Sequence, residues 1–133
     1  SYVVSPLFFK GGNIGKLAIT GTVNDLAMSG AKPLYLTCGL ILEEGLPIST
    51  LDEIIKSMQK TAEEAGVKVV CGDTKVVERG SADQIFINTA GVGVIPQGVE
   101  IHSYSAQAGD KIIVNGFIGD HGATIMQSRA ELA

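Results

Sequence analysis

The sequence contains no tryptophan, only two cysteines and four prolines among its 133 residues, and only 5% aromatic residues. The cysteines lack C-x-x-C spacing and a neighbouring histidine, which excludes a disulfide-rich scaffold and a zinc site of the usual spacing. We expect Cys38 and Cys71 to be small buried hydrophobic residues in a reducing, cytoplasmic compartment, and this interpretation is favoured over a disulfide.

An excess of basic residues is also missing. Ten Lys and Arg against fourteen Asp and Glu give a formal charge of −4, and the basic residues are scattered. Because nucleic-acid and anionic membrane surfaces call for a basic stripe, we expect neither as a partner. The longest apolar run, residues 34–42, is too short to cross a bilayer. No G-x-x-x-x-G-K-[ST] pattern occurs, which excludes a conventional P-loop.

The residues that are abundant indicate a folded domain. Hydrophobic residues make up 45% of the chain and charged residues 18%, a composition typical of a folded domain. Glycine, with 17 of 133 residues, is nearly twice as frequent as the average of about 7%, which indicates tight turns or close backbone approaches. The chain begins in a β-type run and ends within a helical pattern, so we expect it to be part of a longer protein.

Hydrophobic periodicity predicts alternating helices and strands. We expect a helix at 14–29, a second from an N-cap at Ser49 to a stop at Gly66, and a third that opens at 119–122. Strands are predicted at 1–4, 34–42, 67–71, 76–77, 85–95 and 110–115, with loops at 10–13 and 72–75. This order is typical of an α+β fold with a mixed sheet flanked by helices, or of an α/β sandwich.

Asn24 and Asp25 are adjacent polar residues in an otherwise apolar predicted helix. A buried carboxylate costs several kcal/mol unless it is paired, hydrogen-bonded or bound to a metal ion, which makes the pair a candidate site. The alternative, which spacing alone favours, is that both side chains face solvent or cap a neighbouring loop.

The predicted loop 72–75 follows a short apolar strand, and loops after strands often hold ligands. Asp73 is a candidate Mg²⁺ ligand, Thr74 can offer a hydroxyl and an N–H group to a phosphate, and Lys75 can neutralise phosphate charge. The alternative is an ordinary turn, because Gly-Asp is common there.

Gly11 and Gly12 precede a predicted helix, where backbone N–H groups can surround an anion, although such loops are more often flexible connections. At the last helix, Asp120 is a candidate N-cap and His121 a candidate phosphate ligand. Two carboxylates without a Cys/His cluster favour Mg²⁺ over zinc. Since Mg²⁺ normally accompanies nucleotide phosphates, the residues alone predict a magnesium–nucleotide site.

At these positions the sequence resembles the HypE family of hydrogenase maturation proteins in the order and spacing of its motifs. The Asn-Asp pair and the Gly-rich strand end are shared with the wider superfamily of aminoimidazole ribonucleotide synthetase, selenophosphate synthetase and thiamine-phosphate kinase. The matching blocks run through essentially the whole chain, at residues 5–9, 11–18, 21–27, 41–45, 72–77, 86–91 and 119–122.

The resemblance implies an ATP-dependent dehydratase. In that family, ATP activates the amide oxygen of an S-carboxamide on the protein's C-terminal cysteine, and loss of phosphate leaves a thiocyanate, the source of the cyanide ligands of [NiFe] hydrogenase. Catalysis then depends on Mg²⁺ and Lys to hold and neutralise the triphosphate. The resemblance implies Asp25 and Asp73 as Mg²⁺ ligands, with Asn24, Gly72, Thr74 and Lys75 along the phosphates of ATP and Gly11 and Gly12 folded over them.

The family fold implies an N-terminal ATP-binding and dimerisation domain at 1–113, whose sheet pairs in a homodimer to form a β-barrel, and the start of a second domain at 114–133. A homodimer is also expected because the apolar, Gly-interrupted strand at 85–95 would be a liability at a solvent-exposed edge. The implied partners are the carbamoyltransferase HypF and the HypC–HypD complex.

One family Mg²⁺ ligand would lie upstream of Ser1, and the acceptor cysteine tail is not in the chain. We therefore assign no catalytic residue and expect this stretch alone not to complete the reaction. Two alternatives stay open: another ATP-dependent synthetase or kinase of the superfamily that acts on a small molecule, and a non-catalytic dimerisation and docking module.

Overall fold

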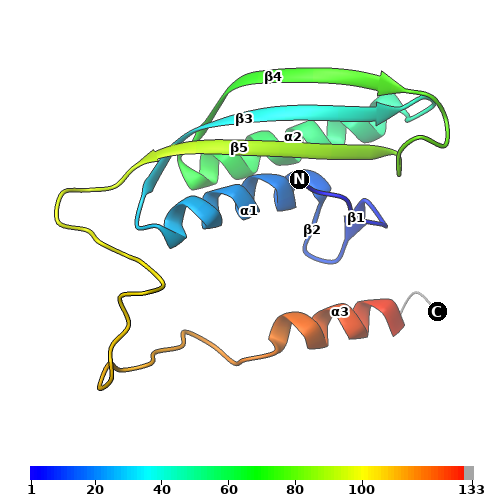
Figure 1. Ribbon diagram of the computed structural model, residues 1–133. Coiled ribbons are helices and arrows are strands. Elements are labelled where there is room, and N and C mark those ends of the chain that lie inside the picture. The colour runs from blue at the N-terminus through cyan, green and yellow to red at the C-terminus, as the bar shows by residue number, and fades with distance from the viewer. Residues whose placement is uncertain (131–133) are drawn as a thin grey trace. The chain divides into compact units, whose positions relative to one another are not determined.

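The structure, a computed structural model, describes residues 1–130 and divides the chain into two compact units, residues 1–101 and the residues from His102 onward. Figure 1 labels the elements of both units. The first unit contains β1 (Phe8–Phe9), β2 (Gly12–Asn13), α1 (Ile14–Met28), β3 (Lys32–Glu43), α2 (Ile48–Ala65), β4 (Lys68–Val77) and β5 (Ile85–Val94).

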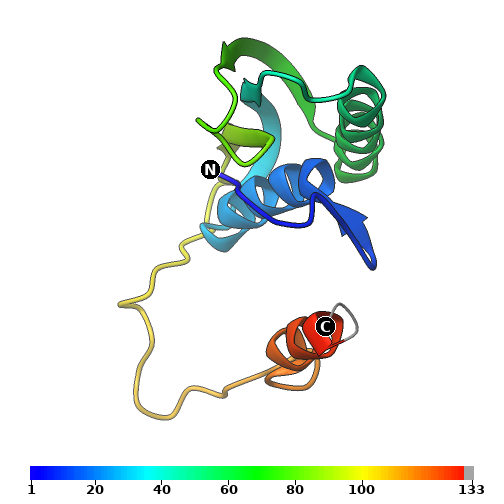
Figure 2. The same cartoon turned by 90° about the vertical axis from the view of Figure 1, so that its right-hand side faces the viewer.

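The central feature of the first unit is a three-stranded mixed sheet in the order β4-β3-β5. Strand β3 pairs in parallel with β4 and antiparallel with β5. Helices α1 and α2 contact each other and cover the same face of the sheet (Figures 1 and 2). The predicted α+β fold with a mixed sheet is confirmed, and among residues 1–101 no helix covers the opposite face.

The burial pattern of β3 explains this arrangement. Leu36, Cys38 and Leu42 are buried against the helices, whereas Tyr35 and Ile41 are 48% and 39% exposed on the other face. Because successive strand residues point to opposite faces, the sheet has one covered and one uncovered face. Each fully buried large aliphatic side chain contributes about 1.5–3 kcal/mol to folding. The fully buried large aliphatic side chains of this core are Ile14, Ile19, Leu36, Ile54, Ile85 and Ile87.

The two long helices begin and end close to the predicted residues. Asn13 caps α1, since its side-chain oxygen accepts a hydrogen bond from the Lys16 N–H at 3.0 Å. Helix α2 follows Pro47 without a side-chain cap, so the prediction that Ser49 caps it was wrong. Gly66 ends α2 as predicted, with a left-handed φ of 67° that glycine adopts without steric cost.

The predicted loop at 72–75 was wrong, because β4 is continuous through it. Gly72, Asp73, Thr74 and Lys75 pair in register with residues 38–41 of β3. The pairing partner β3 keeps this polar stretch extended, an effect that local sequence does not reveal.

The N-terminal segment also differs from the prediction. Residues 10–13 are the turn and second strand of the short β1–β2 hairpin rather than a flexible loop, and Gly11 has a φ of 99° there. The strand expected at 1–4 is reduced to one bridge between Tyr2 and Ile87.

The second unit contains α3 (Asp120–Ala130), which begins close to the predicted start. The strand predicted at 110–115 was wrong: no strand forms there, and residues 102–127 are all exposed. An apolar run needs a neighbouring strand to pair with, and none is present among the described residues of this unit. The domain boundary near residue 113 stays a prediction. None of the helices within residues 1–130 has the length and apolar character needed to span a membrane.

Candidate functional site

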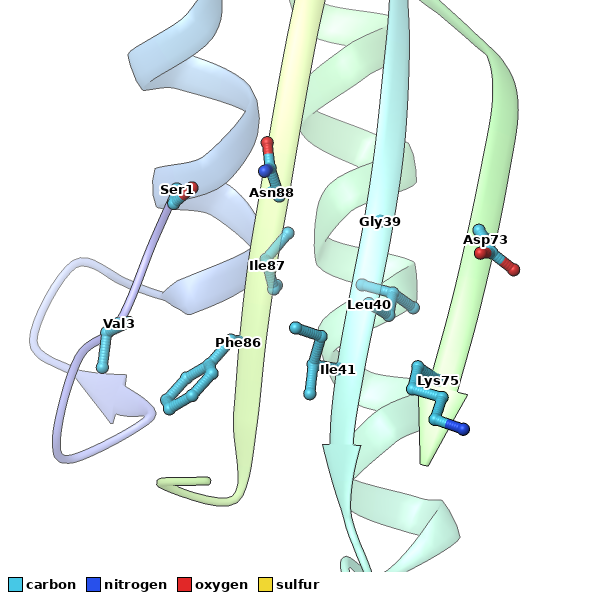
Figure 3. Close-up of a pocket in the computed structure, with 10 residues that line it drawn as sticks. All are labelled: Ser1, Val3, Gly39, Leu40, Ile41, Asp73, Lys75, Phe86, Ile87 and Asn88. Atoms are coloured by element: carbon cyan, nitrogen blue, oxygen red, sulfur yellow. The ribbon is translucent and has the colours of Figure 1, made fainter. Parts of the chain in front are cut away.

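A cavity of about 350 Å³ lies on the uncovered face of the sheet (Figure 3). This volume is within the range of small-molecule sites. The N-terminal segment and all three strands of the sheet contribute to its wall, with the residues Ser1, Val3, Gly39, Leu40, Ile41, Asp73, Lys75, Phe86, Ile87 and Asn88.

Strand register arranges the cavity into two rows across the sheet. One row is Asn88, Gly39 and Asp73, from β5, β3 and β4 in that order. The next row, in the same strand order, is Phe86, Ile41 and Lys75. Residues paired across neighbouring strands face the same side, so both rows point away from the helices. A polar row therefore lies beside a row that combines an apolar surface with a cation.

Asp73 and Lys75 are available for ligands. The Asp73 carboxylate is exposed, and its Oδ1 accepts a hydrogen bond from the Thr74 N–H at 2.9 Å. Within the described part of the chain, the second Asp73 oxygen has no partner and Lys75 forms no ion pair. A free carboxylate oxygen is a suitable ligand for Mg²⁺, and a free ammonium group is suited to a phosphate.

The other two residues of the predicted 72–75 loop do not face the cavity. Gly72 pairs with Cys38 and Thr74 with Leu40, which places both on the helix-facing side of β4. The Thr74 N–H is already bonded to Asp73.

Asn24 and Asp25 lie away from the cavity. Both are exposed on α1, the solvent-facing alternative considered for them. Helix α1 packs against the covered face of the sheet, whereas Asp73 lies on the uncovered face of β4. Residues 1–130 contain no group of three or more His, Cys, Asp or Glu side chains arranged to hold a metal ion. One chain therefore does not bring Asp25 and Asp73 into a common site.

Gly11 and Gly12 belong to the β1–β2 hairpin, which does not contribute to the cavity. The Gly11 carbonyl accepts a hydrogen bond from the Lys16 ammonium group at 3.0 Å, and the Asn13 side chain accepts one from the Lys16 backbone N–H in the first turn of α1. The structure thus gives this hairpin a capping role at the start of α1.

The two cysteines differ in their surroundings. Cys38 is buried, and burial raises the pKa of its thiol. Cys71 is exposed and pairs in register with Thr37 on the uncovered face, so the expectation that it is buried was wrong. Both thiols are free, in agreement with the preference against a disulfide.

Sequence reasoning assigned no role to Gly39 or Asn88. Each interrupts an apolar strand, and such interruptions often mark a close approach by a ligand or a second backbone. The sequence therefore contained a signal for both residues. It did not contain the strand register that places them in one row with Asp73.

Residues 1–95 match the family described as AIR synthase related protein, N-terminal domain. The chain therefore belongs to this family, and the mixed sheet with two helices on one face is the domain that the match covers.

Within this family the chain is similar to carbamoyl dehydratase HypE of Escherichia coli K12, with 58% identity over 132 residues, which are 99% of this chain and 39% of that protein. A solved HypE–HypF complex superposes with a TM-score of 0.93 at 56% identity, covering 99% of this chain and 43% of that one. A solved HypE in complex with ATP superposes with a TM-score of 0.77 at 50% identity, covering 99% of this chain and 39% of that one. The resemblance to HypE is thus confirmed, and the chain spans less than half the length of these relatives.

Proposed function

We propose that this chain is the ATP-binding part of a carbamoyl dehydratase and that it binds ATP with Mg²⁺ in the cavity of the uncovered sheet face. The observation that carries the proposal is the pair of free groups in that cavity, the second oxygen of the Asp73 carboxylate and the Lys75 ammonium. The similarity to a HypE in complex with ATP supports the same ligand.

In this proposal Asp73 binds Mg²⁺ through its free oxygen, and Lys75 neutralises phosphate charge from the next row of the sheet. Gly72 and Thr74 adjoin this site on β4, whereas Asn24, Asp25, Gly11 and Gly12 lie on other surfaces. The roles of all six residues toward ATP and Mg²⁺ stay predictions. Within one chain, Asp25 and Asp73 would hold separate ions.

ATP supplies a phosphoryl group that turns the amide oxygen of an S-carboxamide into a leaving group, so that loss of phosphate yields a thiocyanate. The residues of this chain bind and orient the nucleotide. No residue of the chain is assigned to the bond-breaking step, and the thiocyanate would supply the cyanide ligands of [NiFe] hydrogenase in the whole protein.

A second copy of the chain is the proposed occupant of the other end of the uncovered face. Tyr35, Val92 and Val94 lie there, away from the cavity row of Phe86, Ile41 and Lys75, and are 48%, 65% and 57% exposed. Contiguous exposed apolar residues on a sheet with β5 at its edge favour pairing into a closed barrel.

The solved HypE–HypF complex supports HypF as a partner of the whole protein. We propose the HypC–HypD complex as a further partner of the whole protein and the cytoplasm as its location.

Isothermal titration with MgATP tests the nucleotide site. We expect binding by the chain, loss of at least about tenfold in affinity in Asp73→Asn and Lys75→Ala, and little change in the control Asp83→Asn, an exposed carboxylate outside the cavity. A chain that dimerises but binds no MgATP would contradict the nucleotide site and favour a docking module.

A further inference from the structure

Four glycines interrupt the strands of the three-stranded sheet, and at three of them a Cβ atom would be crowded by its neighbours. A Cβ atom on Gly91 would lie 2.7 Å from the Leu26 and Leu36 side chains, and one on Gly93 would lie 2.7 Å from the Lys32 carbonyl oxygen. On Gly72 it would lie 3.0 Å from the Cys38 carbonyl oxygen. Larger residues at these positions would displace neighbouring atoms.

Gly39, in the central strand β3, is different. The heavy atom nearest to its Cβ position is the Asn88 carbonyl oxygen at 3.9 Å, an ordinary contact distance. Gly39 is also not among the residues with a positive φ, so its backbone suits any amino acid. Glycine weakens a strand through its conformational entropy and its missing side chain. The fold of this chain thus gives no reason for a glycine at the centre of its sheet.

The residues around Gly39 indicate that the space above it is suited to a polar ligand. Asn88 and Asp73 flank it in the same row, about two strand spacings or ~10 Å apart. The Asn88 side chain is exposed and has no hydrogen-bond partner among residues 1–130. Figure 3 shows Gly39 as the gap between these two polar side chains, with Ile41 and Phe86 in the row beside it.

We propose that Gly39 is the floor of the subsite for a magnesium-bound phosphate and that Asn88 binds this phosphate from the side opposite Asp73. The proposal rests on the proposed function and adds two residues to it. An amide N–H₂ donates hydrogen bonds to phosphate oxygens, while the Asp73 carboxylate serves the cation. A spacing of about 10 Å is wide enough for the ion and the phosphate group together, provided that no side chain rises between the flanking residues.

The decisive variant is Gly39→Val, with Gly39→Ala as a smaller step. Valine suits a strand, and the heavy atom nearest to its Cβ position lies 3.9 Å away. We therefore expect its side chain to fill the proposed subsite while the fold is kept. Asn88→Leu removes the amide group and replaces it with an apolar side chain of similar size. The measurements are MgATP affinity by titration calorimetry, the midpoint of thermal unfolding, and the molar mass by sedimentation.

We expect Gly39→Val to lower MgATP affinity by at least about tenfold, and Asn88→Leu by about threefold to tenfold, with unchanged mass and an unfolding midpoint at or above that of the wild type. Wild-type affinity in both variants would overturn the inference while the proposed function stands. A lost dimer with intact MgATP affinity would also overturn it, by identifying a second copy as the occupant. Absence of MgATP binding by the wild type would overturn the proposed function itself, and the inference with it.

Discussion

A chain of hydroxyl groups holds the N-terminal segment against α1 and β5. Because the Ala18 carbonyl can only accept, the Thr89 hydroxyl donates to it at 3.0 Å. The Thr22 and Thr89 hydroxyl oxygens are 2.6 Å apart, and the Tyr2 hydroxyl lies 3.3 Å from that of Thr22. Tyr2 and Ile87 also exchange two backbone hydrogen bonds. These contacts place Ser1 and Val3 at the wall of the cavity.

Gly21 makes room for the Tyr2 ring, so Gly21→Ala tests this anchor. The added Cβ would lie 2.2 Å from the Tyr2 hydroxyl oxygen, a clash that displaces the ring. Overpacking costs about 1–3 kcal/mol, and the higher helix propensity of alanine offsets about 1 kcal/mol of it. We therefore expect a net loss of stability of up to about 2 kcal/mol in denaturant unfolding. The control Gly39→Ala should keep or raise stability, and a Gly21→Ala variant more stable than the wild type would contradict the packing described for Tyr2.

At the scale of elements, Glu43 at the end of β3 holds the connection between β4 and β5. Its two carboxylate oxygens accept hydrogen bonds from the backbone N–H groups of Gly80 and Gln84. Gln84 has a φ of 70°, a left-handed conformation that is uncommon without glycine. The carboxylate therefore stabilises a turn that would otherwise be unfavourable, directly after the strand that carries Asp73 and Lys75.

Glu43→Ala should loosen this turn. Hydrogen bonds to a charged acceptor contribute about 1.5–3 kcal/mol, so we expect a loss of that order and faster hydrogen exchange at the Gly80 and Gln84 amides. The matched control is Glu44→Ala, because the Glu44 side chain forms no hydrogen bond or ion pair in the described structure. Unchanged exchange at both amides in Glu43→Ala would show that the turn holds without the carboxylate.

Elements with strong periodicity were predicted well, because their signal is local. The helices α1 and α2 and the strands β3 and β5 were all placed within a few residues of their observed bounds. Strand β4 was divided in two because Gly72 and its polar neighbours have the composition of a turn, while pairing with β3 keeps them extended. The strand prediction at 110–115 was wrong because pairing is missing there: the apolar residues 112–114 are exposed, and no strand pairs with them in the described structure.

The residues of the candidate site also divide into those that the sequence identified and those that only the strand register reveals. Asp73 and Lys75 were identified from the motif, because their chemistry can be recognised without knowing the fold. Asn88 and Gly39 are 15 and 34 positions from Asp73 and lie in two other strands, so only the strand register shows that the three residues share one row. Asp25 was grouped with Asp73 by chemistry, but the sheet separates them within one chain.

At the scale of the whole molecule, the uncovered face has a polar end with the cavity and an apolar end with Tyr35, Val92 and Val94. We expect a homodimer at micromolar concentration through the apolar end. Val92→Lys should convert it to a monomer, since a lysine at the centre of a buried contact is costly, whereas Ile48→Lys, at a position 78% exposed on α2, should not. Analytical ultracentrifugation distinguishes the two masses, and a monomeric wild type would contradict the dimer.

Binding of MgATP to the uncovered sheet face can be followed residue by residue by backbone NMR during a MgATP titration. We expect the largest shift changes at Gly39, Asp73, Thr74 and Asn88, with small changes on the exposed side of α2. Changes confined to residues 102–130, or no changes at saturating MgATP, would contradict binding at this face.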